Sequence, residues 1–293
     1  MKAKPSEDRR SLVVPGAEAR SLYSEGGYGR PTDDGLSLSP EEAVHLERVG
    51  KIEVESWPLR PDHAVATAYH DLRQRGYYLQ HRTGETHLEL YPRGTHPSSG
   101  DARDVEALHE DDDVALDADS LKAVVDDDGD VTYFEFEEWD VEGDVGTPAA
   151  SHEAHAADVG YVVDEAADSP LHTQGGYGRP DGNHLVLSAE EAAYLVEDGG
   201  LEVENPPPSD ADLYADLRDR GLCPRTGFKF GTRYRLYTEY ADGEHSPYLL
   251  EPAPASLPAV EVSRAVRLAH GVRKTVVYAL EAGEYVTVRR ERP

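Results

Sequence analysis

Helical and strand-like patterns alternate through the last third of the chain. We expect one helix over 211–221, because its apolar positions follow helical spacing and Gly221 is a residue type that ends helices. That apolar stripe consists of Leu213, Tyr214 and Leu217. A second helix is expected over 261–273, with the stripe Val262, Val266, Ala269 and Val272. Strand-like patterns fall at 228–238, 246–251, 275–280 and 285–290.

Two segments earlier in the chain carry the signal that starts a helix. Ser39 followed by Glu42, and Ser188 followed by Glu191, form the S-x-x-E pattern in which each side chain accepts a backbone N–H at the helix start. Each helix is followed by a short alternating stretch, KIEVE at 51–55 and GLEVE at 200–204, which predicts a strand. A small α+β piece therefore precedes each larger mixed region.

The same motifs occur twice along the chain. GGYGRP stands at 26–31 and 175–180, and SPEEAVHL at 39–46 matches SAEEAAYL at 188–195, both at an offset of 149 residues. YHDLRQRG at 69–76 matches YADLRDRG at 214–221 at an offset of 145. Shorter matches are RTG at 82–84 and 225–227, and LELY at 88–91 with YRLY at 234–237. The chain is therefore a tandem duplication of a unit of about 140 residues, a period too long for a solenoid.

The predicted fold class is α/β (α+β), with each repeat a small α+β domain followed by a mixed-sheet α/β domain. We assign residues 1–150 to the first repeat, and 151–174 to a linker and the start of the second. Residues 175–208 form the second N-terminal domain, and 209–293 the second mixed-sheet domain. The segment 101–170 holds 24 acidic and two basic residues, and part of it is expected to be the linker.

Composition narrows the class of protein. The 293 residues carry 58 acidic and 29 basic side chains, of which 23 are Arg and 6 are Lys, for a net charge of −29. Low hydrophobicity with high charge is also typical of disorder, but 17 Tyr and regular aliphatic runs favour a folded protein with the very acidic surface of a halophile. No apolar run approaches the ~18 residues of a membrane helix, and no signal peptide is expected. The single cysteine, Cys223, excludes an intramolecular disulfide, so a cytoplasmic protein is expected.

The charge is distributed unevenly. Residues 211–293 hold 13 basic and 11 acidic side chains, whereas residues 1–210 hold 16 basic and 47 acidic ones. An acidic protein repels nucleic acid, so a locally basic C-terminal third indicates that a polyanion binds there. The alternative is chance variation in composition.

The two repeats differ in residues that can do chemistry. The second has Tyr237, His245 and Lys274. The basic residues of its last helix have no counterparts in the first repeat, except that Lys122 stands opposite Lys274. A base, an acid and a cation can cleave RNA by taking the ribose 2′-OH proton, protonating the 5′-oxygen and neutralising the phosphorane. Tyr acts as a base only where a nearby cation favours its ionised form. The alternative is that all three have ordinary core, loop and surface roles.

At this point the second repeat resembles the archaeal tRNA-intron (tRNA-splicing) endonucleases of the two-unit, homodimeric class. The resemblance rests on five motifs in order, DLRDRG (216–221), RTGFKFG (225–231), YRLY (234–237), EHSPYLL (244–250) and SRAVRLAHGVRK (263–274). It implies a pseudo-catalytic first repeat and a catalytic second repeat, nuclease-like in fold. It also implies cleavage of precursor tRNA at bulge-helix-bulge junctions, without metal or other cofactor, giving 2′,3′-cyclic phosphate and 5′-hydroxyl ends.

The resemblance also assigns roles to residues. It implies that Tyr237 is the general base, His245 the general acid and Lys274 the phosphorane-stabilising cation. It further implies that Arg267 and Arg289 sandwich a bulge base, with Arg290 as a substitute for Arg289. Guanidinium planes stack well on bases. The alternative for Arg267 is a role on the helix surface.

The first repeat acquires a role from the same resemblance. VDDDGDVTYF at 125–134 resembles an acidic loop, near 126–130, that docks into the partner subunit of the homodimer, with Asp127, Asp128 and Asp130 as candidates. The alternative is a plain acidic β-turn, since D-G is a common hairpin signal. Tyr91 and His96 stand near the counterparts of the triad, but the first repeat lacks the rest of the motifs and is expected to be inactive.

Two other functions remain open from the sequence. One is a non-catalytic RNA-binding or assembly subunit of a splicing endonuclease. The other is a metal-dependent nuclease, which needs carboxylates clustered beside the scissile phosphate. The acidic residues of the C-terminal region are scattered, which favours the metal-independent endoribonuclease.

Overall fold

The structure, a computed structural model, describes residues 1–81, 84–208, 212–240, 245–281 and 283–293. Arg82 and Thr83 of the first RTG motif, Ala211 at the start of an expected helix and Glu244 of EHSPYLL lie outside the described residues. Contacts divide the chain into two compact units. The first comprises Met1–Glu138, Pro254–Val266 and Val286–Pro293, and the second comprises Trp139–Ala253 and Arg267–Tyr285.

Each unit contains one small N-terminal domain, and the two domains have the same topology. In the first, the strand order is β3 (Arg30–Thr32), β4 (Gly35–Leu38), β2 (Leu12–Pro15), β1 (Lys2–Pro5) and β5 (Glu53–Val54). In the second it is β14 (Arg179–Asp181), β15 (His184–Leu187), β13 (Gly160–Val163), β12 (His152–Ala157) and β16 (Leu201–Val203). In both, the last pair is parallel and the others antiparallel. The identical order confirms the duplication.

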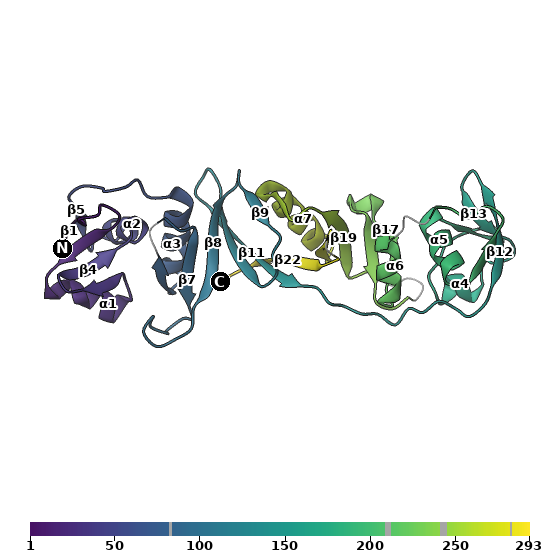
Figure 1. Ribbon diagram of the computed structural model, residues 1–293, viewed down its shortest axis with the longest axis horizontal. Coiled ribbons are helices and arrows are strands. Elements are labelled where there is room, and N and C mark those ends of the chain that lie inside the picture. The colour runs from purple at the N-terminus through teal and green to yellow at the C-terminus, as the bar shows by residue number, and fades with distance from the viewer. Residues whose placement is uncertain (82–83, 209–211, 241–244, 282) are drawn as a thin grey trace. The chain divides into compact units, whose positions relative to one another are not determined.

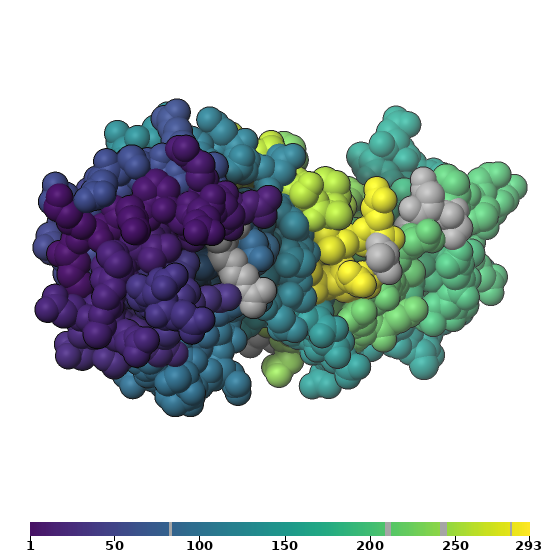
Figure 2. All heavy atoms as spheres, turned by 60° about the vertical axis from the view of Figure 1, so that its left-hand side comes forward, coloured from purple at the N-terminus to yellow at the C-terminus, as the bar shows by residue number. Residues whose placement is uncertain are grey.

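Helices complete these domains. They are η1 (Ala17–Ala19), α1 (Arg20–Gly26) and α2 (Pro40–Arg48) in the first, and α4 (Pro170–Thr173) and α5 (Ala189–Glu197) in the second. Both predicted capping boxes are formed, because the Ser39 and Ser188 hydroxyls accept the N–H groups of Glu42 and Glu191, and those carboxylates accept the serine N–H groups. Figure 2 shows the first N-terminal domain, in purple, as one continuous surface.

The sheet of the first unit follows its N-terminal domain. Its strand order is β22 (Tyr285–Glu291), β11 (Val131–Glu138), β10 (Ser120–Val125), β8 (Arg103–His109), β7 (His87–Tyr91) and β6 (Tyr78–His81). Helix α3 (His63–Gln74) covers one face, where its buried Val65, Tyr69 and Leu72 pack against Leu88 and Val105 (Figure 1). A separate ribbon pairs β9 (Asp113–Ala115) with β20 (Ser256–Pro258).

The sheet of the second unit has the order β17 (Cys223–Thr226), β18 (Tyr234–Tyr237), β19 (Tyr248–Ala253) and β21 (Thr275–Leu280). Helix α6 (Asp212–Asp219) packs on it through Tyr214 and Leu217, which contact Leu236 and Val277 in one buried cluster. The other helices of this region are η2 (Phe228–Phe230) and α7 (Ala259–Gly271).

The repeated sequence motifs join the two domains of each repeat. The Arg73 guanidinium lies 4.0 Å from the centroid of the Tyr28 ring and donates to the Gly26 carbonyl at 2.7 Å. Its counterpart Arg218 lies 3.7 Å from the Tyr177 ring centroid and donates to the Gly175 carbonyl at 2.8 Å. GGYGRP and DLRxRG are therefore complementary halves of one cation–π and hydrogen-bonded contact.

Gly221 ends α6 as expected. It has a φ of +73°, its N–H donates to the Arg218 carbonyl, and the Leu222 N–H donates to the Leu217 carbonyl. This is the Schellman arrangement, in which glycine adopts the left-handed conformation without strain. Gly76 ends α3 in the same way, with a φ of +89°.

Two expectations for the C-terminal region are wrong in part. The strand predicted over 228–238 is confined to β18, because Phe228–Phe230 form a 3-10 turn enclosed by Gly227 and Gly231. Val272 was expected in the buried stripe of the second helix, but α7 ends at Gly271 and Val272 is 40% exposed. Val262, Val266 and Ala269 are buried as expected. Within the described part of the chain, none of the helices combines the length and hydropathy needed to cross a bilayer.

Candidate active site

Strand register brings the predicted triad to one end of the second unit's sheet. Leu236 of β18 pairs with Tyr248 of β19, which pairs with Thr275 of β21. Tyr237 follows Leu236 directly, Lys274 precedes Thr275 directly, and His245 stands three residues before Tyr248. All three therefore leave adjacent strands at the same edge. His245 is exposed there, and Tyr237 is buried.

Ser246, the residue that follows His245, anchors the Lys274 side chain. Its ammonium donates to the Ser246 carbonyl and, at 2.7 Å, to the Ser246 hydroxyl, which is itself buried. Burial lowers the pKa of Lys274 below its usual 10.5, and the nearby cations Arg235 and Lys229 lower it further. A cation crowded by other cations is a good place for a phosphate. Sequence reasoning missed Ser246, although it stands inside the EHSPYLL motif.

The end of α7 determines where Lys274 lies. The Arg273 N–H donates to the His270 carbonyl, and the Lys274 N–H donates to the Ala269 carbonyl at 2.8 Å, which together form a Schellman cap. Arg273 occupies the left-handed position with a φ of +57°, where α3 and α6 have glycine. A non-glycine residue in this conformation costs about 1 kcal/mol. The cap directs the chain from α7 into β21 with Lys274 at the turn.

Tyr237 lies in an aromatic and cationic setting. Its ring packs with Val145, Cys223 and Tyr240, and meets the Tyr240 ring edge-on with centroids 6.0 Å apart. The Arg235 guanidinium lies 5.7 Å from the Tyr237 ring centroid.

The two predicted RNA-binding arginines differ in their surroundings. Arg267 is exposed on α7, four residues before the helix ends at Gly271 and seven residues before Lys274. Arg289 lies on β22 and forms ion pairs with Glu137 and Glu135 of β11. Arg290 is exposed and forms no ion pair with any described residue.

The acidic loop is a well-formed hairpin turn between β10 and β11. The Asp126 carboxylate accepts the N–H groups of Asp128 and Asp130 at 3.1 and 2.8 Å, and Gly129 has a φ of +83°. Asp127 lies 3.3 Å from the His109 ring. This geometry leaves Asp127 largely exposed.

Register identifies the corresponding edge of the first repeat. Leu88, Val105 and Leu121 pair across β7, β8 and β10 as Tyr234, Leu250 and Val277 pair across β18, β19 and β21. By this alignment Tyr91 stands where Tyr237 does, Gly100 replaces His245, and Ala118 replaces Lys274. The first repeat therefore has the candidate base without the acid or the cation.

Two first-repeat residues have roles other than those their spacing suggests. Lys122 aligns with Tyr278 rather than with Lys274, so the sequence pairing was wrong. Its side chain is buried and forms salt bridges with Glu106 and Asp117 at 2.8 and 2.7 Å. The error arose because the first repeat joins β8 to β10 without a helix, which shifts the alignment by residue count.

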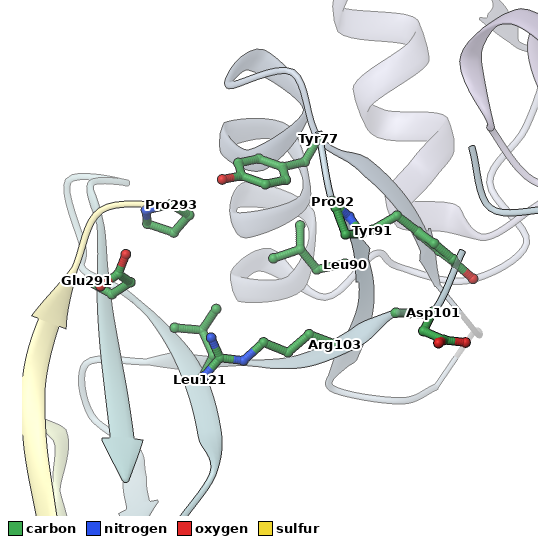
Figure 3. Close-up of a pocket in the computed structure, with 10 residues that line it drawn as sticks. Tyr77, Leu90, Tyr91, Pro92, Asp101, Arg103, Leu121, Glu291 and Pro293 are labelled. Carbon is green, nitrogen blue, oxygen red and sulfur yellow. The ribbon is translucent and has the colours of Figure 1, made fainter. Parts of the chain in front are cut away.

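His96 and Tyr91 are also held in structural contacts. The His96 ring bonds the Tyr23 carbonyl at 2.7 Å and the Ser98 hydroxyl at 2.8 Å. Burial, and then the Glu89 carboxylate that accepts its hydroxyl proton, raise the pKa of Tyr91, which opposes action as a base. The edge forms a cavity of about 340 Å³ in which Tyr77, Leu90 and Leu121 are lining residues, and the Tyr91 ring points away from Tyr77 (Figure 3).

Comparisons with known proteins agree with this division. The family model for the tRNA intron endonuclease catalytic C-terminal domain matches residues 209–288, the region of the triad. The model for the N-terminal domain of the same family matches twice, at 6–58 and 157–213.

Similar proteins named tRNA-splicing endonuclease occur in several archaea. The protein of Methanococcoides burtonii is 31% identical, with 99% of each chain covered. The protein of Natronomonas pharaonis is 35% identical over 92% of this chain and 93% of that one, and the protein of Haloferax volcanii is 33% identical over 91% and 92%. With both domain types matched and likeness along nearly the whole length, the chain belongs to the tRNA intron endonuclease family.

Proposed function

We propose that this protein is an endoribonuclease, a tRNA-intron lyase, that excises introns from precursor tRNA. The observation that carries the proposal is the register of β18, β19 and β21, which gathers Tyr237, His245 and Lys274 at one edge. That edge lies within the residues matched by the family's catalytic-domain model. The excess of basic over acidic residues in 211–293 supports a polyanionic substrate.

The proposed reaction needs no metal. Tyr237 takes the proton of a ribose 2′-hydroxyl, and the 2′-oxygen attacks the adjacent phosphorus in line. The bond from phosphorus to the 5′-oxygen breaks, and His245 protonates that oxygen. Lys274 stabilises the phosphorane charge as it develops. The products are a 2′,3′-cyclic phosphate and a 5′-hydroxyl.

The proposed substrate is the bulge-helix-bulge structure at exon–intron junctions. In-line attack needs a nucleotide released from A-form geometry, which a bulge supplies. Arg267 and Arg289 are proposed to sandwich a bulge base. For Arg289 this requires the guanidinium to leave its ion pairs with Glu135 and Glu137.

The proposed assembly is a homodimer. Each chain has one complete triad, because the first repeat has Gly100 and Ala118 in place of the acid and the cation. An intron has two junctions, so two chains supply two catalytic edges. Asp127, Asp128 and Asp130 are proposed to dock into a basic pocket of the partner subunit, where their charge fixes the assembly.

The test is cleavage of a short bulge-helix-bulge RNA in high salt with excess EDTA. We expect site-specific cutting by the wild type, a cyclic-phosphate end, and a loss of about 10²–10⁴-fold in His245→Ala. Loss of all cutting on chelation would identify a metal nuclease. RNA binding without cutting by folded wild type would identify a non-catalytic binding subunit.

A further inference from the structure

The turn between β17 and β18 presents an aromatic and basic surface. Phe228 is 89% exposed, more than any other large apolar side chain of the described residues. Lys229 beside it is also exposed, and Phe230 is half-buried. The chain has only four Phe among 293 residues, and two of them stand in this one turn.

This surface borders the candidate active site. The Lys274 ammonium lies 5.5 Å from the centroid of the Phe230 ring, and the Lys229 ammonium lies 4.9 Å from the same centroid. Phe230 is therefore shared between the two cations. The turn joins β17 to β18 at the opposite end of β18 from Tyr237, and its Phe230 ring nevertheless lies beside the Lys274 ammonium. Phe228 stands two residues before Phe230.

The backbone holds the turn in one conformation. The Phe230 N–H donates to the Gly227 carbonyl at 2.7 Å, and the Gly231 N–H donates to the Phe228 carbonyl at 3.0 Å. A Cβ on Gly227 would come within 2.4 Å of the Thr232 hydroxyl oxygen and 2.6 Å of its carbonyl oxygen. Gly231 has a φ of +71°, which favours glycine. The turn is thus pre-organised with Phe228 in water, which lowers the entropic cost of binding to it.

Among the residues that the structure describes, the first repeat lacks such a turn. Between Gly84 and Leu88 it has three residues, Glu85, Thr86 and His87, where the second repeat has six between Gly227 and Tyr234. The Glu85 carbonyl is engaged internally, with the His81 ring at 2.8 Å. The aromatic turn therefore accompanies the complete triad and is missing where the triad is incomplete.

We propose that Phe228 and Phe230 are a stacking platform for an unpaired RNA base next to the scissile phosphate, with Lys229 contacting the RNA backbone. Exposed aromatic rings interleaved with cations are the usual surface for unpaired nucleic acid, because every base has a π-face and every nucleotide a phosphate. The position beside Lys274 makes RNA the favoured occupant, since this edge must admit the phosphate. The inference rests on the proposed function and adds a base-binding element to the triad and the two arginines.

Binding is tested with full-length His245→Ala protein as the parent, so that RNA is bound but not cut. Bulge-helix-bulge RNAs carry the fluorescent base 2-aminopurine at one bulge position at a time. We expect Phe228→Ala to weaken RNA binding about tenfold and to abolish fluorescence quenching at one position. Phe228→Trp restores both, because it restores a π-face, whereas Phe228→Leu does not. Trp57→Ala, which removes an exposed aromatic from the first repeat, leaves both unchanged.

Three outcomes would overturn the inference. Equal affinity and unchanged quenching in Phe228→Ala, with wild type still cutting RNA, would refute the platform and leave the proposed function intact. Conversion of a dimer to a monomer by Phe228→Ala, with RNA affinity retained, would show that the ring is a subunit contact. A parent that binds no RNA, together with wild type that cuts none, would refute the proposed function and with it the platform.

Discussion

The two repeats share one framework and differ at one edge. Both have the same N-terminal strand order, the same Arg–Tyr contact between domains and the same strand register. At the edge, the second has Tyr237, His245 and Lys274, whereas the first has Tyr91, Gly100 and Ala118. The helix before Lys274 and the aromatic turn are also confined to the second repeat. Duplication preserved the residues that hold the fold, and the two repeats differ in the segments that join strands.

The largest expected effect compares the lysines of the two repeats. Lys274→Ala should reduce cleavage by about 10²–10³-fold with little change in stability, because it removes the cation that is proposed to stabilise the phosphorane. Lys122→Ala should lower the free energy of unfolding by about 2–3 kcal/mol, because it leaves Glu106 and Asp117 without their buried partner. Single-turnover cleavage and urea unfolding measure the two. Equal loss of cleavage in both folded variants would contradict the division into active and inactive edges.

The next effect concerns the pH dependence of stability, in which the two N-terminal domains differ. Burial first, and then the neighbouring His70 and the cations Arg73, Lys51 and Arg48, lower the pKa of His45 from 6.5 to about 3. As the pH falls, His45 is therefore protonated in the unfolded chain before it is protonated in the folded protein. This contribution to stability is fully present above pH 6.5 and is lost as pH falls from 6.5 toward 3.

Tyr194 occupies the equivalent position of the second repeat, and burial raises its pKa to about 12. Between pH 8 and pH 5, we expect the free energy of unfolding of His45→Tyr to fall by about 2 kcal/mol less than that of the wild type. Urea unfolding at both pH values measures this change. Burial lowers the pKa of His81, but the hydrogen bond with Glu41 opposes this effect, and the pKa is raised overall. Because His81 is present in both the wild type and His45→Tyr, its contribution cancels in this comparison. Parallel pH profiles for the two proteins would refute the assignment.

A smaller effect tests the anchor of Lys274. Ser246→Ala removes the hydroxyl that accepts the ammonium, and we expect single-turnover cleavage to fall about tenfold, which is about 1.4 kcal/mol. Ser246→Thr keeps the hydroxyl and should retain most activity. Equal rates for Ala and wild type would mean that the carbonyl alone positions Lys274.

The smallest effect concerns the cap of α7. Arg273→Gly should raise the free energy of unfolding by up to about 1 kcal/mol, because glycine adopts a φ of +57° without strain. It should also weaken RNA binding slightly, since one cation near the site is lost. Gly221→Arg is the reverse change in α6 and should destabilise the protein. A stability loss in Arg273→Gly would show that the arginine side chain contributes more than its backbone strain costs.

Local patterns predicted much of the fold because they depend on neighbouring residues. The S-x-x-E pairs, the C-terminal glycine of α6 and strand β21 all depend on contacts within a few positions. The strand expected over 228–238 is formed only at β18, because Gly227 and Gly231 close a turn before it that outweighs the apolar pattern of two Phe residues. Lys122 was misaligned because residue counting cannot see that the first repeat lacks a helix between β8 and β10.

The sequence by itself determined the duplication, the fold class, the acidic surface and the identity of the candidate triad. These follow from motif order, periodicity and charge, which need no knowledge of contacts. Only the tertiary structure decided that Ser246 holds Lys274, that Phe230 lies beside Lys274, and that Lys122 is a buried structural cation. Such contacts join residues far apart along the chain, and strand register and helix ends bring them together.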